Sequence, residues 1–103
     1  MEKNKVLSML GLARRAGRLS MGHDAALKSI RSGKASILIF ADDTSERVRR
    51  ELISAAEKSK SKIPVFFPEI SISEIHYSCG YKAGIITVDD ENFSKKIISL
   101  IQE

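Results

Sequence analysis

The hydrophobic positions along this chain change their spacing several times, which predicts alternating helices and strands. Four segments carry apolar residues three and four positions apart, as amphipathic helices do: residues 6–13, 24–31, 45–60 and 92–101. Four short apolar runs have the character of buried strands: residues 19–22, 35–41, 65–67 and 83–88. Residues 68–73 are expected to form a loop, and residues 74–79 a short helix that ends at Gly80.

The alternation of helices with strands is typical of an α/β fold in which helices cover both faces of one sheet. We therefore expect a three-layer α/β/α sandwich. The chain has 103 residues, close to the common size of one domain, and it contains no repeat or linker. Residues 1–103 are expected to form a single domain.

Cysteine content and hydropathy point to a cytoplasmic protein. Cys79 is the only cysteine, so no internal disulfide can form. The apolar run at residues 37–41 is far shorter than the roughly 20 residues that a membrane helix needs. The first residues lack the apolar core of a signal peptide. We expect a monomer in the cytoplasm, with no membrane partner.

The net charge of +4 is unevenly distributed. Residues 1–40 carry eight basic and two acidic residues, a balance of +6, whereas residues 41–103 have a balance of −2. A basic half is typical of a surface that binds a polyanion, although a solvated, solubilising face gives the same composition. The basic run at residues 58–62 needs no ligand, because cations at a helix C-terminus complement the helix dipole.

Two acidic clusters are the main candidates for catalysis or metal binding. Asp42 and Asp43 follow one predicted strand, and residues 89–91 follow another. Carboxylates at strand ends can bind Mg²⁺, but we favour helix capping because each cluster precedes a helix. His76 and Cys79 are too few ligands for a metal site. We expect no cofactor and no enzymatic activity; an enzyme that uses the acidic strand ends is an alternative.

A basic, glycine-containing stretch offers a different chemistry. Gly22 begins a predicted helix, where bare backbone N–H groups can approach a phosphate closely. Five basic residues lie near this helix start or in adjacent turns: Arg14, Arg15, Arg18, Lys28 and Lys34. The chain has no tryptophan and six Phe and Tyr residues, which does not favour base stacking on single strands. Recognition of folded RNA through shape and backbone suits this composition better.

Several landmarks in a fixed order resemble a known family over nearly the whole chain. They are Gly-Leu-Ala-Arg-Arg-Ala-Gly-Arg-Leu at residues 11–19, Gly22 with Lys28, the blocks at residues 33–43 and 63–68, and Gly80. This order resembles the kink-turn RNA-binding superfamily of ribosomal proteins seven-Ae and thirty-e, and in particular its small bacterial members. The resemblance implies an α/β/α sandwich with a mixed four-stranded sheet.

The resemblance also implies where RNA would bind. Family members grip the kink-turn, a bent RNA helix with tandem sheared G·A pairs, by the glycine-led start of the second helix and a hydrophobic loop before the fourth helix. The first element corresponds here to Gly22, His23, Asp24, Ala25 and Lys28, and the second to Ile70, Ser71, Ile72 and Ser73. Ile70 and Ile72 are expected to be exposed and to pack against a flipped-out nucleotide; core packing is the alternative.

Two pairs of neighbouring residues depart from the family pattern. Many members carry Asn-Glu where this chain has Asp24 and Ala25, and Leu-Gly where it has Ile75 and His76. A carboxylate accepts hydrogen bonds from guanine N1 and N2 but cannot donate to O6 as an amide does. We expect a non-catalytic protein that binds a kink-turn in structured RNA such as ribosomal RNA. The alternative is a protein-interaction module of the same fold, with Ile70 and Ile72 as its contact patch.

Overall fold

The computed structural model describes all 103 residues and contains every helix and strand that the hydrophobic pattern predicts. The elements follow one another in the order α1 (Lys3–Arg15), β1 (Leu19–Met21), α2 (His23–Arg31), β2 (Ile37–Phe40), α3 (Glu46–Lys58), β3 (Val65–Phe66), α4 (Ile72–Cys79), β4 (Ile85–Val88) and α5 (Glu91–Gln102). None of the helices combines the length and the apolar content that crossing a membrane requires.

The four strands form one mixed sheet in the order β1-β4-β2-β3. Strands β2 and β3 are parallel, whereas β4 runs antiparallel to both β1 and β2. Met21 and Phe40, the last residues of β1 and β2, therefore pair with Ile86 and Ile85 at the beginning of β4. We call this edge, where β1, β2 and β3 end and β4 begins, the Gly22 end of the sheet.

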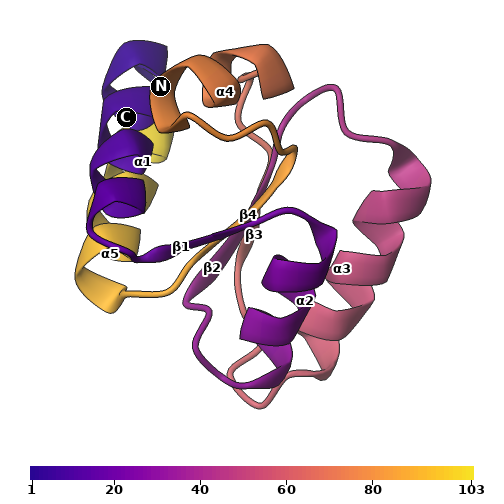
Figure 1. Cartoon of the computed structure of the whole chain (residues 1–103). Coiled ribbons are helices and arrows are strands. Elements are labelled where there is room, and N and C mark those ends of the chain that lie inside the picture. Colours follow the sequence, from indigo (N-terminus) through magenta and orange to yellow (C-terminus); the bar gives the residue numbers. More distant parts are fainter.

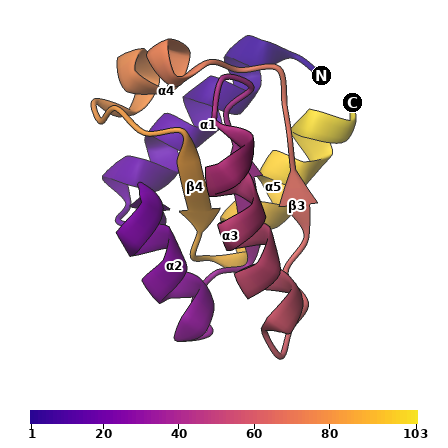
Figure 2. The ribbon, with the colours of Figure 1, turned by 90° about the vertical axis from the view of Figure 1, so that its right-hand side faces the viewer.

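Helices cover both faces of the sheet, as a three-layer sandwich requires. Figure 1 shows α1, α4 and α5 on one side and α2 and α3 on the other, and Figure 2 shows α2 and α3 in front of the strands. Successive strand residues point to opposite faces. Ile37 and Ile39 accordingly pack in the core beside α1 and α5, whereas Leu38 and Phe40 pack in the core beneath α2 and α3.

Helix α4 begins at Ile72, two residues earlier than the hydrophobic spacing predicts. The reason is a capping box, a local pattern in which Ser71 and Glu74 each bond the backbone N–H of the other. Residues 72 and 73, expected in a loop, therefore form the first turn of the helix. Gly80 ends α4 in the left-handed conformation, as predicted.

Candidate nucleic-acid interface

Gly22 connects β1 directly to α2 without an intervening loop. Its φ of 94° and ψ of 166° lie in a region that is essentially restricted to glycine. Its N–H donates to the carbonyl oxygen of Ile85 at 2.9 Å, which ties the start of α2 to the first residue of β4. The glycine predicted to lead the second helix therefore sits at its N-cap.

The start of α2 presents free backbone donors. The first four N–H groups of a helix have no partner within the helix. Only that of Gly22 is bonded here; no side chain caps α2, and the N–H groups of His23, Asp24 and Ala25 have no acceptor. These donors and the positive end of the helix dipole coincide. The start of α2 can therefore bind an anion such as a phosphate.

His23 links this helix start to α3. Its Nδ1 lies 2.8 Å from Oδ1 of Asp24, and its Nε2 lies 2.9 Å from Oε2 of Glu51. Hydrogen bonding to Asp24, and then to Glu51, raises the pKa of His23 above its ordinary value. Protonated His23 thus neutralises part of the negative charge that two carboxylates bring to the site.

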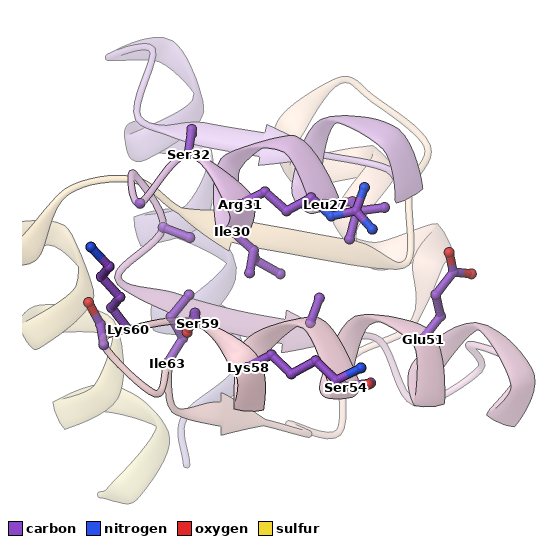
Figure 3. Close-up of a pocket in the computed structure, with 14 residues that line it drawn as sticks. Leu27, Ile30, Arg31, Ser32, Glu51, Ser54, Lys58, Ser59, Lys60 and Ile63 are labelled. Atoms are coloured by element: carbon purple, nitrogen blue, oxygen red, sulfur yellow. The ribbon is translucent and has the colours of Figure 1, made fainter.

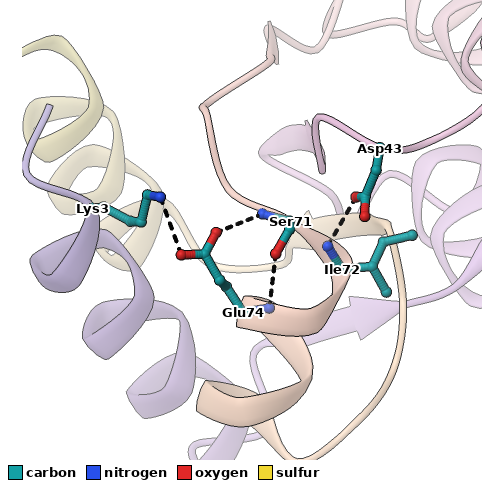
Figure 4. A network of polar contacts seen from close by, with 5 residues as sticks. All are labelled: Lys3, Asp43, Ser71, Ile72 and Glu74. Carbon is teal, nitrogen blue, oxygen red and sulfur yellow. Dashed lines mark hydrogen bonds and ion pairs between the residues drawn. The ribbon is translucent and has the colours of Figure 1, made fainter.

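The start of α4 has most of its backbone donors satisfied by its own chain, as Figure 4 shows. The N–H of Glu74 donates to the Ser71 hydroxyl at 3.1 Å, and the N–H of Ser71 donates to the Glu74 carboxylate at 2.9 Å. The N–H of Ile72 donates to Asp43 at 2.9 Å. The hydrogen bond from Ser71 and the nearby Lys3, 3.1 Å away, lower the pKa of Glu74.

The starts of α2 and α4 lie at the same end of the sheet, beside the beginning of β4. Gly22 bonds Ile85, and the neighbouring Gly84 packs against Ile72 and Thr44. A Cβ atom at position 84 would lie 2.6 Å from Oγ1 of Thr44 and 3.1 Å from the Ile72 side chain, so a larger residue there would displace one of these side chains. The fold thus brings together the two elements that the family resemblance identified.

The expected exposure of Ile70 is wrong. Its side chain is fully buried in the core, and its carbonyl oxygen accepts from the N–H of Asp42 at 2.8 Å. Ile70 directly precedes the capping residue of α4, where a hydrophobic side chain commonly packs against the residue five positions later. That residue is Ile75, which is fully buried in the same core. Ile70 therefore stabilises α4 and cannot contact a nucleotide.

The other residues predicted beside α4 differ in accessibility. Ile72 is half-buried, and Ser73 is exposed. The hydroxyl and the N–H of Ser71 are both engaged in the capping box. The two-isoleucine contact patch expected of a protein-interaction module is absent, since one of its members lies in the core.

The predicted basic residues fall into two groups. Arg14 stacks on the ring of Tyr81, which lies 5.2 Å from its guanidinium carbon, and Arg15 and Lys28 are exposed without an ion-pair partner. Arg18 and Lys34 lie at the opposite end of the sheet from Gly22. The carbonyl oxygen of Arg18 accepts from Asp89, beyond the end of β4, and its side chain lies 3.8 Å from Asp90.

Aromatic exposure is a feature that the composition did not reveal. Three of the six aromatic side chains are exposed: Phe67 by 52%, Tyr77 by 94% and Tyr81 by 45%. Tyr77 lies on α4, and Tyr81 follows its end. Their number was known from the sequence, but their exposure depends on how a short helix packs. Tyr81 joins the candidate site through its contact with Arg14.

The two acidic clusters do not converge. Since β2 and β4 are antiparallel, the residues that follow them lie at opposite ends of the sheet. Asp90 caps α5, as expected. Helix α3, which follows Asp42 and Asp43, is capped by Ser45, whereas Asp43 accepts the N–H of Ile72 in the first turn of α4. Asp89 caps no helix and instead accepts three hydroxyl hydrogen bonds, from Ser20, Ser29 and Thr87. No three His, Cys, Asp or Glu side chains are grouped to hold a metal ion.

Comparison with known families agrees with this architecture. Residues 4–98 match the Ribosomal protein L7Ae/L30e/S12e/Gadd45 family. The chain belongs to this family. The L7Ae/L30e-type sandwich is also found in a Bacillus halodurans protein of unknown function, whose structure has a TM-score of 0.86, is 29% identical and covers 96% of this chain and 98% of its own. The Giardia lamblia 15.5kD RNA binding protein (TM-score 0.74, 18% identity, 97% and 87% coverage) shares the fold.

Relatives within the L7Ae/L30e family align along nearly their whole length. The RNA-binding protein YlxQ of Enterococcus faecium is 31% identical, over 97% of this chain and 94% of its own. Its Bacillus subtilis namesake is 30% identical, over 90% and 91%. The large ribosomal subunit protein eL30 of Candida albicans is 28% identical, over 95% and 92%.

Proposed function

We propose that this L7Ae/L30e-family protein binds a kink-turn in structured RNA and catalyses no reaction. The observation that carries the proposal is the start of α2, where three backbone N–H groups are free at a glycine turn. Family relatives named as RNA-binding or ribosomal proteins support it. These relatives favour structured RNA, such as ribosomal RNA, as the ligand. We propose that the RNA is cytoplasmic and that one copy of the chain binds it.

The chemistry of the site assigns a role to each group. The N–H groups of His23, Asp24 and Ala25 would donate to a phosphate, since Gly22 has no side chain to keep the RNA backbone away. The fully exposed Asp24 carboxylate would accept hydrogen bonds from guanine N1 and N2. Lys28, one helical turn further, would neutralise an adjacent phosphate.

The second part of the contact would come from α4 and α1. Ile72, half-buried beside Gly84, and the exposed Ser73 form the first turn of α4. Arg14 and Arg15 end α1 and would contact flanking phosphates. Arg18 and Lys34 lie at the far end of the sheet, so only the RNA stems on either side of the kink-turn bend would reach them.

A titration with a short kink-turn RNA tests the proposal. The control RNA has Watson–Crick pairs in place of the sheared G·A pairs, and both are measured at two salt concentrations. We expect binding of the kink-turn RNA that weakens steeply with salt, as phosphate contacts require. Equal binding of both RNAs would indicate a merely basic surface, and binding of neither would refute the proposal.

Charge variants locate the contact. Lys28→Gln should lower the slope of log affinity against log salt by about 1, since it removes one phosphate contact. Lys96→Gln is the matched control, because Lys96 is also exposed but lies on α5, in the other helix layer. A Lys96→Gln effect as large as that of Lys28→Gln would place the RNA elsewhere.

A further inference from the structure

A cleft of about 660 Å³, drawn in Figure 3, lies between helices α2 and α3 and the loops that follow them. Its apolar lining is entirely aliphatic: Leu27, Ile30, Ala35, Ala55 and Ile63. No aromatic residue lines it. A nucleobase would find no stacking partner there, whereas an aliphatic side chain would find a matching surface.

The rims of the cleft are positively charged. In Figure 3, Arg31 extends from α2 and Lys58 from α3 on opposite sides of the cleft, and Lys60 lies near one end. None of these three cations forms an ion pair. Glu51, the one acidic lining residue, lies at the other end and is held by His23 at 2.9 Å. The cleft therefore has unpaired cations around an aliphatic centre.

This combination identifies the chemistry of an occupant. Carboxylates would pair with the rim cations, and an aliphatic side chain between them would pack on Leu27 and Ala55, the two partly exposed aliphatic residues of the lining. We propose that the cleft between α2 and α3 docks an acidic, amphipathic segment of a partner protein. The segment lies between the helices as an amphipathic helix lies in a hydrophobic groove. Its acidic residues face Arg31, Lys58 and Lys60, away from the Glu51 end.

The cationic end of the cleft is distinct from the RNA site at Gly22, and the opposite end meets that site at Glu51, which His23 holds. Helix α2 has nine residues and is about 13 Å long, and Arg31 lies at its far end. RNA at the start of α2 and a protein segment over the cations can therefore be bound together. The proposal goes beyond RNA binding and does not depend on it. It also gives the basic run at residues 58–62 a role in addition to complementing the dipole of α3.

Peptide titration followed by amide chemical shifts tests the proposal. The probe is a 15-residue peptide with leucine at helical spacing and glutamate elsewhere, and its control has lysine in place of glutamate. We expect the acidic peptide to shift the resonances of Leu27, Ala55 and Ile63 and to leave Gly22 unchanged. No shift at millimolar acidic peptide, or equal binding of the lysine peptide, would overturn the proposal.

Charge reversal separates the two surfaces. Lys58→Glu should weaken peptide binding about tenfold or more, because like charges would then oppose each other. Ala55→Gln, which narrows the cleft without a charge change, should weaken it as well, and Lys96→Glu on α5 is the matched control. All three variants should keep kink-turn affinity. If Lys58→Glu weakens the RNA and leaves the peptide unaffected, the cleft is part of the RNA footprint and the proposal fails.

Discussion

The starts of α2 and α4 lie at the same end of the sheet, but they differ in whether their backbone N–H groups have hydrogen-bond acceptors. At α4, three of the first four N–H groups are bonded, by Ser71, Glu74 and Asp43. At α2, only the N–H of Gly22 is bonded, and its acceptor is the backbone of β4. Side chains of the protein therefore bond most of the donors at the start of α4, whereas most of the donors at the start of α2 remain free.

This difference separates a helix start that is closed by side chains from one whose donors can bind an anion. A side-chain cap occupies the donors that an anion would need, whereas a glycine start leaves them free at a cost of only a few tenths of a kcal/mol relative to a capped helix. The family resemblance assigned RNA contacts to both starts. The hydrogen bonding concentrates the anion-binding capacity at α2 and gives α4 a largely packing role.

Ile70→Ala should have the largest effect, and it should be on stability. Removing a fully buried isoleucine costs about 2 to 5 kcal/mol of unfolding free energy, measured by urea denaturation. Ile72→Ala, at a half-buried position, should cost about 1 kcal/mol. RNA affinity of folded Ile70→Ala protein should be unchanged. A stable Ile70→Ala protein that had lost RNA binding would place the residue in the interface after all.

Gly22→Ala should come next, with an effect on both stability and binding. A side chain at this φ and ψ costs about 1 to 3 kcal/mol, and relief of the strain would turn the free N–H groups away from the RNA. We expect kink-turn affinity to fall about tenfold or more, which corresponds to 1.4 kcal/mol or above.

Gly33→Ala is the matched control for Gly22→Ala. Gly33 has a φ of 80° with open space around it, and it lies after the opposite end of α2. The Gly33→Ala variant should lose a comparable amount of unfolding free energy and keep its RNA affinity. Normal affinity in Gly22→Ala would remove the basis for placing phosphate at this helix start.

Ser71→Ala should have a smaller effect, confined to stability. Loss of a capping hydroxyl costs about 1 kcal/mol, which thermal denaturation can measure. Ser45→Ala, which removes a longer capping bond of 3.4 Å on α3, should cost less. Kink-turn affinity should change by less than about twofold, below the 1.4 kcal/mol that a tenfold change requires. A large loss of affinity would mean that the α4 start takes part in binding beyond its packing role.

Local patterns predicted most of this fold, but they did not predict the residues whose roles depend on contacts between several segments. Strand runs and helix-ending glycines gave the elements, because each signal lies within one segment. Two patterns at the start of α4 also lie within one segment: the packing of Ile70 on Ile75, and the capping box of Ser71 and Glu74. Both patterns are typical of a helix start and could have been recognised in the sequence. Treating Ile70 as a loop residue led to the error about its exposure.

Other features could not be predicted from local patterns. Asp89 accepts hydrogen bonds from hydroxyl groups on β1, α2 and β4, so its role exists only once these elements are packed together. The relative positions of the acidic clusters depend on the antiparallel pairing of β2 with β4. The cleft likewise arises from the packing of α2 against α3, and sequence spacing on either helix does not reveal it.

The smallest predicted effect is a pH dependence of RNA binding that originates at His23. Hydrogen bonds to Asp24 and Glu51 raise the pKa of His23, so its contribution to stability is complete below the ordinary histidine value and is lost as pH rises through the raised one. Deprotonation also makes the start of α2 one charge more negative. Affinity for RNA should therefore fall as pH rises from 6.0 to 8.5.

The change should be about twofold to fivefold, the size of an exposed ion pair. His23→Gln should flatten the profile, because glutamine does not titrate in this range. His76→Gln is the matched control, since His76 is the other histidine and lies on the exposed side of α4. If the profile stays unchanged in His23→Gln and flattens in His76→Gln, the titrating contact belongs to α4. The open helix start would then not be the one that meets the RNA.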